Sequence, residues 1–165
     1  MNIKIRSEIK KIKDSIITTR RDIHMYPELA FNEYRTGKLV KDRLCSLGIE
    51  VQTDIGKTGV VGLLKGKNQG KTIALRADMD ALPIQEKNNL PYKSKNDGIM
   101  HACGHDGHTA MLLGVAEVLS KYTKKINGTI KFLFQPAEEG QGGARFMIKD
   151  GALNGVDEAY GIHLW

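Results

Sequence analysis

Residues 71–80, KTIALRADMD, place an apolar run directly before two carboxylates. The run TIAL is typical of a buried strand. Side chains alternate along an extended segment, so Asp78 and Asp80 lie on one side of it, together with Arg76. Two interpretations of these aspartates stay open: they form a structural pair that Arg76 neutralises, or they orient metal-bound imidazoles from behind.

Helical and extended patterns alternate along the chain on both sides of this strand. Residues 84–100 are polar and rich in turn formers, which indicates a surface excursion. The alternation predicts an α/β fold in which helices cover a sheet. The other expected elements are helices at 5–16, 37–47, 111–119 and 142–150 and strands at 49–55, 59–66, 128–136 and 158–165.

The bulk composition is that of one soluble globular domain of 165 residues, long enough to bury a substantial core. The formal net charge is +6, but the lysines are dispersed and do not alternate with aromatic residues, so no nucleic-acid partner is expected. No apolar run approaches the length of a membrane span, and two cysteines are too few for a disulfide framework. The expected location is the cytoplasm.

Residues 101–110, HACGHDGHTA, contain three of the five histidines and one of the two cysteines. Gly104 allows a loop to turn the side chains of Cys103 and His105 to the same side. A thiolate and an imidazole suit zinc and other late divalent ions. The alternative is a buried cysteine beside a solvated histidine.

The glycines of this stretch also bear on where the next helix begins. The three histidines are spaced as one helical face, but Gly104 and Gly107 argue against a helix through them. We therefore expect the helix to become regular near Met111, with Asp106 or Thr109 capping its start.

The remaining polar candidates follow other predicted strands. Near a metal, one carboxylate of the adjacent pair Glu138 and Glu139 can bind the ion while the other acts as general base, although such pairs normally point apart into solvent. His163 has apolar neighbours, among which a lone histidine is more often a core residue than a ligand. Residues 20–34, RRDIHMYPELAFNEY, are interpreted as an elbow between two helices, with no role assigned to His24. Because ligands bind at the carboxyl ends of strands in open α/β sheets, one site collecting these segments is expected.

Five motifs, taken together, resemble one enzyme family. They are RDIHMYPELAFNE, RADMDALP, HACGHDGHTAMLLG, FQPAEEGQGGA and GIHLW, in this order over residues 21–165. The set closely resembles the metal-dependent aminoacylase and carboxypeptidase superfamily, and within it the hippurate hydrolase or N-acyl-amino-acid amidohydrolase branch. The resemblance implies the N-terminal part of a zinc-peptidase-like catalytic domain.

The resemblance also implies roles for the matching positions. Glu138 matches the general acid/base. Asp78 and Asp80 occupy a segment that carries a ligand histidine and its orienting aspartate in the wider superfamily. Since no histidine stands at position 78, both aspartates are expected to support ligands rather than to bind metal. A complete site would hold two divalent ions, zinc, manganese, cobalt or nickel, through ligands that match Cys103, His105, Glu139 and His163.

The implied reaction is hydrolysis of the amide bond of an N-acyl amino acid, such as an N-acetyl or N-benzoyl derivative. Glu138 would take a proton from the attacking water and return it to the departing amine. Family members are longer, with a dimerisation and lid domain and a further histidine ligand. Residues 1–165 are therefore expected to be the N-terminal portion of the catalytic domain and inactive alone, and the full-length protein a homodimer or larger. The alternative is a non-catalytic metal-binding module.

Overall fold

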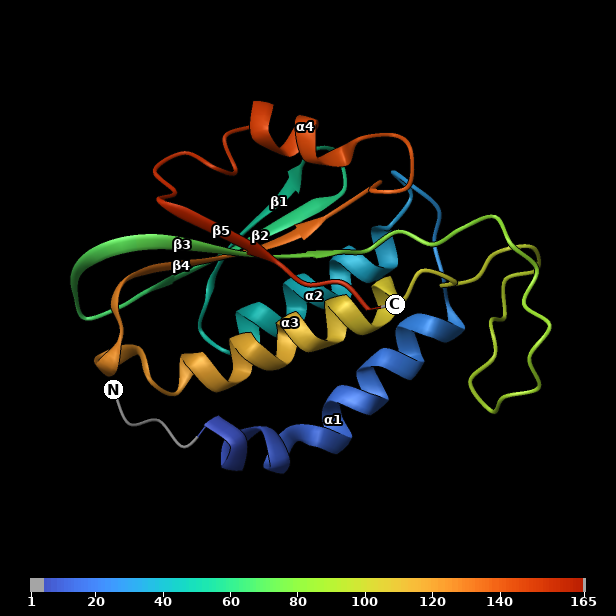
Figure 1. Cartoon of the computed structure of the whole chain (residues 1–165), viewed down its shortest axis with the longest axis horizontal. Helices are drawn as coiled ribbons and strands as arrows, with labels where there is room; N and C mark the ends of the chain where they lie inside the picture. The colour runs from blue at the N-terminus through green and yellow to red at the C-terminus, as the bar shows by residue number, and fades with distance from the viewer. Residues whose placement is uncertain (1–4, 165) are drawn as a thin grey trace.

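The computed structural model describes residues 5–164, which are built around a five-stranded mixed sheet (Figure 1). Across the sheet the strands follow the order β1-β2-β4-β3-β5. Neighbours in the run β1-β2-β4 pair antiparallel, whereas β3 runs parallel to both β4 and β5. The strands are β1 (Glu50–Ile55), β2 (Gly59–Lys65), β3 (Asn68–Asp78), β4 (Asn127–Gln135) and β5 (Glu158–Gly161).

Helices cover both faces of the sheet, as the α/β prediction requires. On one face lie α2 (Tyr34–Ser46) and α3 (His105–Ser120), and α1 (Ile5–Met25) packs on α3 as an outer layer (Figure 1). The short helix α4 (Gly143–Lys149) lies on the opposite face (Figure 1). None of the helices in residues 5–164 has the length and apolarity that a membrane crossing requires. The predicted fold class, a sheet covered by helices, is confirmed.

The main core fills the layer between the sheet and the helices α2 and α3. Phe132 and Phe134 of β4 have no exposed surface and share one cluster with Leu44 of α2 and Leu112 of α3. Leu133 points to the opposite face and is buried in a smaller cluster there. The central place of β4 therefore explains its nearly continuous apolar run, because both of its faces are covered.

Most predicted elements lie within a few residues of their expected positions. The first helix continues beyond the expected end to Met25, and the last strand ends at Gly161 rather than running on. Trp165, which the prediction included in that strand, lies outside the described residues. The excursion after β3 contains no helix or strand of its own and is closed by backbone hydrogen bonds of 3.0 Å between Leu82 and Met100. It projects from one end of the sheet (Figure 1).

The prediction that a helix does not run through the histidine cluster is wrong for two of its three histidines, His105 and His108. The first residue of α3 is His105, so His105 and His108 both lie in its first turn. Gly104 adopts a left-handed conformation, with φ 82°, at the position before the helix. A glycine is suited to that conformation, and the helix starts directly after it. The glycine that argued against a helix therefore marks where the helix begins.

Neither residue expected to cap α3 does so, because both are bonded elsewhere. No side chain caps the helix start in the described structure. The Asp106 carboxylate accepts hydrogen bonds from Arg20 and His24 of α1. The Thr109 hydroxyl donates to the backbone carbonyl of Asp78, at 2.8 Å. Contacts with α1 and β3 thus take the place of local capping.

The carboxyl ends of three parallel strands lie at one edge of the molecule. Asp78 at the end of β3 pairs in register with Gln135 at the end of β4, and Arg76 pairs with Gly161 at the end of β5. The segments that leave these strands therefore start side by side. This topology brings together the residues that the sequence singled out.

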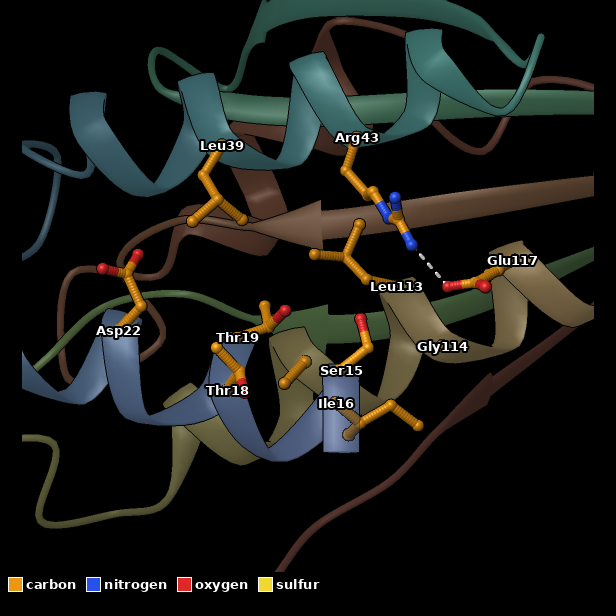
Figure 2. Close-up of a pocket in the computed structure, with 11 residues that line it drawn as sticks. Ser15, Ile16, Thr18, Thr19, Asp22, Leu39, Arg43, Leu113, Gly114 and Glu117 are labelled. Carbon is orange, nitrogen blue, oxygen red and sulfur yellow. Dashed lines mark hydrogen bonds and ion pairs between the residues drawn. The ribbon is translucent and has the colours of Figure 1, made fainter. Parts of the chain in front are cut away.

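A cavity of about 310 Å³ lies between the helices α1, α2 and α3 (Figure 2). Its lining includes Ile16, Leu113 and the hydroxyl group of Ser15, and the ion pair between Arg43 and Glu117 borders it. None of the residues that line it is a candidate catalytic or metal-binding residue. The cavity is therefore separate from the site described next.

Candidate metal centre

All the residues predicted to form the site meet where the parallel strands end. Asp78 ends β3 and Asp80 follows it, while Cys103 lies just before α3 and His105 is its first residue. The loop after β4 carries the pair of glutamates, and the segment after β5 carries His163. The fold thus collects these side chains from four separate parts of the chain.

Three groups of side chains among the described residues bring metal-binding atoms within 4.8 Å of one another. His105 belongs to every group, which makes it the centre of the arrangement. The groups are Cys103–His105–His163, His105–Glu138–Glu139 and Asp78–His105–His108. Sulfur, nitrogen and oxygen donors of this kind suit zinc and related divalent ions.

Buried atoms without hydrogen-bond partners face each other in this site. Neither Nε2 of His105 nor Oε1 of Glu139 has a hydrogen-bond partner among the described residues, and both atoms are buried. They lie 3.7 Å apart, and Oε2 of Glu138 lies 4.0 Å from the same nitrogen. Buried polar atoms are rarely left unpaired in folded proteins. These residues therefore fit a bound divalent cation.

Asp80 contacts two of the candidate ligands at once. Its Oδ1 lies 3.2 Å from Nδ1 of His105, and its Oδ2 accepts the backbone N–H of Glu139 at 3.0 Å. Burial raises the pKa of Asp80, but the bonds from His105 and from backbone amides outweigh it and lower the pKa overall. A carboxylate on Nδ1 orients the ring so that Nε2 faces the site. These contacts favour the orienting interpretation for Asp80.

Asp78 is paired with Arg76, as the structural interpretation expects, and it also bonds an imidazole, that of His108. Its carboxylate forms an ion pair with Arg76 at 2.8 Å and accepts from Nδ1 of His108 at 2.5 Å. The other ring nitrogen of His108 accepts the backbone N–H of Leu164, at 2.8 Å. His108 therefore links β3 to the segment that carries His163.

The thiol of Cys103 lies 3.6 Å from Nε2 of His163, which is exposed. Burial, together with the nearby carboxylates of Glu139 and Asp78, raises the pKa of Cys103 to about 12. Without a cation the group is therefore a protonated thiol at neutral pH. Binding of a divalent ion would offset the carboxylate charge, and the thiol would lose its proton on coordination.

His24 does not join the metal-binding groups but ties three segments together nearby. Its Nδ1 lies 2.8 Å from Asp106 of α3, and its Nε2 lies 3.3 Å from Glu86 of the excursion. The bond to Asp106 is the main cause of a raised pKa of His24, and burial opposes it. Arg20 reaches the same Asp106 carboxylate at 3.1 Å. This network joins α1, the excursion and the first turn of α3.

Sequence reasoning overlooked His108 and the partner of His24. The signal for His108 was present, because His105 and His108 are spaced three apart and share a helical face once the helix starts directly after Gly104. No local signal pointed to Asp106 as the partner of His24, since 82 residues separate them.

The acid sensitivity of this region is expected to depend on His101, which is 4% exposed and has no hydrogen bond at either ring nitrogen. Burial lowers the pKa of His101 to about 4, against the attraction of the Asp106 charge. An unfolded histidine has a pKa of about 6.5, so between pH 6.5 and 4 only the unfolded chain takes up the proton. This group therefore lowers the free energy of unfolding by up to about 3 kcal/mol as the pH falls through that range.

In His101→Gln the loss of stability towards acid should accordingly be smaller than in the wild type, measured by urea denaturation at pH 7.5, 6 and 5. His24→Gln is the matched control: it also replaces a buried histidine, but one whose pKa is shifted in the opposite direction. The pKa of His24 is raised, so its contribution is present below pH 6.5 and is lost as the pH rises through the folded-state pKa. If the free energy of unfolding falls with pH by the same amount in the wild type and in His101→Gln, the prediction is contradicted.

Comparison with known proteins gives the family. The family model described as "Peptidase family M20/M25/M40" matches residues 74–165, more than half of the chain. The chain is 54% identical over 164 residues to "Thermostable carboxypeptidase 1" of Saccharolobus solfataricus, covering 98% of this chain and 42% of the relative. It is 53% identical over 153 residues to the "Hippurate hydrolase" of Campylobacter jejuni, covering 93% of this chain and 39% of the relative.

A solved structure shows the same fold. The YXEP protein of Bacillus subtilis, described as a dinuclear metal binding peptidase from the M20 family, superposes with a TM-score of 0.91 at 47% identity. The match covers 94% of this chain and 44% of that one. The chain thus spans well under half the length of the proteins it matches. The family model, the relatives and the fold agree, and the chain belongs to peptidase family M20/M25/M40.

Proposed function

We propose that the whole protein is a metal-dependent amidohydrolase that cleaves the amide bond of N-acyl amino acids. The observation that carries the proposal is the pair of buried, unpaired atoms on His105 and Glu139, with the carboxylate of Glu138 beside them. One carboxylate thus faces a candidate ion while its neighbour stays free to move a proton. The family membership and the names of the relatives support the same chemistry.

The proposed metal ligands are Cys103, His105, Glu139 and His163, and Asp78 and Asp80 are proposed to support them. When bound, two divalent ions lower the pKa of a water and polarise the scissile carbonyl. The YXEP protein is described as binding two metals, which supports two ions here. Zinc, manganese, cobalt and nickel all remain candidates, because each accepts imidazole and carboxylate ligands.

Glu138 is the proposed general base and acid. Its side chain is 40% exposed, so water and substrate can reach it, while its Oε2 lies 4.0 Å from His105. Glu138 takes the proton of the attacking water and later gives it to the nitrogen of the departing amine. Bond cleavage then leaves a carboxylate and a free amino acid.

The substrate class follows from what the named relatives have in common. Relatives are named carboxypeptidase, hippurate hydrolase and N-acyl-L-amino acid amidohydrolase, and these names support an N-acylated amino acid, which carries a carboxylate, as the substrate. The net charge of +6 on residues 1–165 favours the approach of such an anion to this part of the protein. N-acetyl and N-benzoyl amino acids are therefore the first substrates to try.

A non-catalytic metal module is the second candidate. Structural zinc sites are closed and usually use more cysteines. Here the site contains one cysteine, Cys103, and the carboxylate of Glu138 stands beside the proposed ligand Glu139, 4.0 Å from Nε2 of His105. A spare carboxylate next to a proposed ligand favours catalysis.

The family resemblance also supports proposals about organisation. We propose that residues 1–165 form the N-terminal portion of the catalytic domain and that the whole protein is a homodimer or larger assembly in the cytoplasm. The support for a portion of a longer protein is the share of the relatives that the chain covers, 42% of the carboxypeptidase and 39% of the hippurate hydrolase. The assembly and the location rest on the family resemblance alone.

The whole protein loaded with zinc, manganese or cobalt should release free amino acid from hippurate or an N-acetyl amino acid, and chelation should abolish the release. Residues 1–165 assayed alone should show negligible turnover and weak metal binding, because the proposed ligand His163 is exposed to competing water there. Metal binding without turnover of any N-acyl amino acid by the whole protein would support the non-catalytic module instead. Rapid turnover by residues 1–165 alone would contradict the proposed need for more of the chain.

A further inference from the structure

The loop at 136–143, which carries Glu138 and Glu139, contains a strained backbone position. Ala137 has φ 50°, in the left-handed region that residues with a Cβ rarely adopt, and it is fully buried. The loop also turns so tightly that a Cβ at Gly143 would lie 1.7 Å from the carbonyl oxygen of Pro136. Local preference does not explain this path, so surrounding contacts must hold it.

Glu33 supplies one of these contacts from a distant part of the chain. Its Oε1 accepts the backbone N–H of Ala137 at 2.8 Å, and its Oε2 accepts the hydroxyl of Thr58. The carbonyl of Ala137 in turn accepts the N–H of Gly143, at 2.9 Å. Both backbone polar groups of the strained residue are therefore bonded, one of them to a carboxylate 104 residues away.

A second carboxylate holds the loop on the other side of Glu138. Asp80 accepts the backbone N–H of Glu139 at 3.0 Å and also contacts His105. Glu138 thus stands between two backbone amides, at Ala137 and Glu139, each bonded to a buried carboxylate from elsewhere in the chain. Since the backbone at these positions sets where the side chains start, the two contacts fix the positions from which both glutamates project towards His105.

An ordinary capping role does not account for Glu33. Glu33 directly precedes α2, yet no side-chain hydrogen bond caps that helix from this position. Glu28 does so instead, accepting the backbone N–H groups of Arg35 and Thr36 at 2.8 Å each.

Stability of the core does not account for Glu33 either. The residue has no exposed surface, and it forms no ion pair with any residue from 5 to 164. A buried carboxylate without a cation is costly, and hydrogen bonds only offset that cost, so a gain in folding free energy does not explain why Glu33 is there. What the carboxylate supplies is an acceptor for the backbone N–H of Ala137.

We propose that Glu33 is a positioning residue: its buried carboxylate holds the strained turn at Ala137 and thereby aims Glu138 and Glu139 at His105. The function of those two glutamates rests on the proposed amidohydrolase activity, but the geometry of the turn does not.

Three substitutions in the whole protein separate the positioning role from a general loss of stability. Glu33→Leu replaces the carboxylate that accepts the Ala137 N–H by an apolar side chain of similar size. Glu33→Gln keeps a carbonyl for the Ala137 N–H, and its amide can donate to the Thr58 hydroxyl oxygen. Thr58→Val is the matched control, because it removes the other partner of the same carboxylate and leaves the Ala137 bond in place.

The first measurement is hydrogen exchange followed by mass spectrometry, comparing peptides that cover residues 135–143 with peptides from β4. Glu33→Leu should speed exchange in 135–143 by about tenfold or more beyond any change in β4. Glu33→Gln and Thr58→Val should stay within about threefold of the wild type. If Leu at position 33 prevents folding, Glu33→Asp makes the same test, because a carboxylate one methylene shorter does not reach Ala137.

The second measurement is zinc affinity, by competition with a chromophoric chelator. Glu33→Leu should weaken zinc binding by roughly 10–100-fold, and Glu33→Gln should restore it. Equal acceleration of exchange in the loop and in β4, or a Glu33→Gln variant as impaired as Glu33→Leu, would overturn the positioning role. A wild-type protein that binds none of zinc, manganese, cobalt and nickel would refute the proposed function, and the exchange comparison would still decide the role of Glu33.

Discussion

Replacing Glu138 by glutamine in the metal-loaded whole protein is expected to lower kcat for N-acyl amino acids by about 10²–10⁴-fold. Glutamine keeps the size of the side chain but does not accept the proton of the attacking water. Glu138 lies beside the candidate ligands, with its Oε2 4.0 Å from His105, yet the unpaired buried oxygen belongs to Glu139. Bound metal should therefore stay near the wild-type amount, measured by elemental analysis alongside the kinetics.

Two further variants calibrate this result. Glu139→Gln should lower metal content as well as turnover, because its buried Oε1 faces His105 at 3.7 Å. Glu50→Gln, on the exposed strand β1, should change neither. Near-normal turnover by Glu138→Gln would show that another group moves the proton.

Replacing His105 by alanine is expected to cause the largest loss of metal affinity of any single substitution. His105 takes part in all three groups of metal-binding atoms, whereas every other member belongs to one group. Loss of a supporting contact commonly weakens metal binding by about 10–100-fold, so loss of this imidazole should exceed about 100-fold. Zinc competition titrations on the whole protein measure the change directly.

The matched control for this experiment is His101→Gln. His101 is also buried, lies four residues earlier and belongs to none of the three groups among the described residues. Its substitution should leave zinc affinity at pH 7.5 within about threefold of the wild type. If His105→Ala retains tight zinc binding, the centre of the site has been assigned wrongly.

The candidate site was largely predictable from the sequence because strong local patterns mark it. Cys103 and His105 flank a glycine, and Glu138 and Glu139 follow a strand that Pro136 stops. Strand ends are recognisable from alternating and apolar runs, and parallel strands bring their ends to one edge. The predicted meeting of these segments follows from that rule, and the structure places them together.

The start of α3 was mispredicted because a glycine has two opposite meanings for a helix. In the middle of a helix it is unfavourable, but before the first turn it adopts conformations that other residues avoid. Here Asp106 contacts α1 and Thr109 contacts β3, and these contacts hold the residues after Gly104 in a helix. Those partners are remote in sequence, so no local pattern reveals them.

By itself the sequence determined the α/β class, most of the strands and helices, and the set of chemically capable residues, because periodicity and residue type are local properties. Only the tertiary structure decided which of those residues contact each other. The bond from Glu33 to Ala137 spans 104 residues, and the bond from His24 to Asp106 spans 82. Such pairs depend on the strand order β1-β2-β4-β3-β5 and on how α1, α2 and α3 pack, and many segments distant in sequence compete for each contact. The strain at Ala137 likewise exists only because distant carboxylates hold the loop in a conformation that its own residues do not favour.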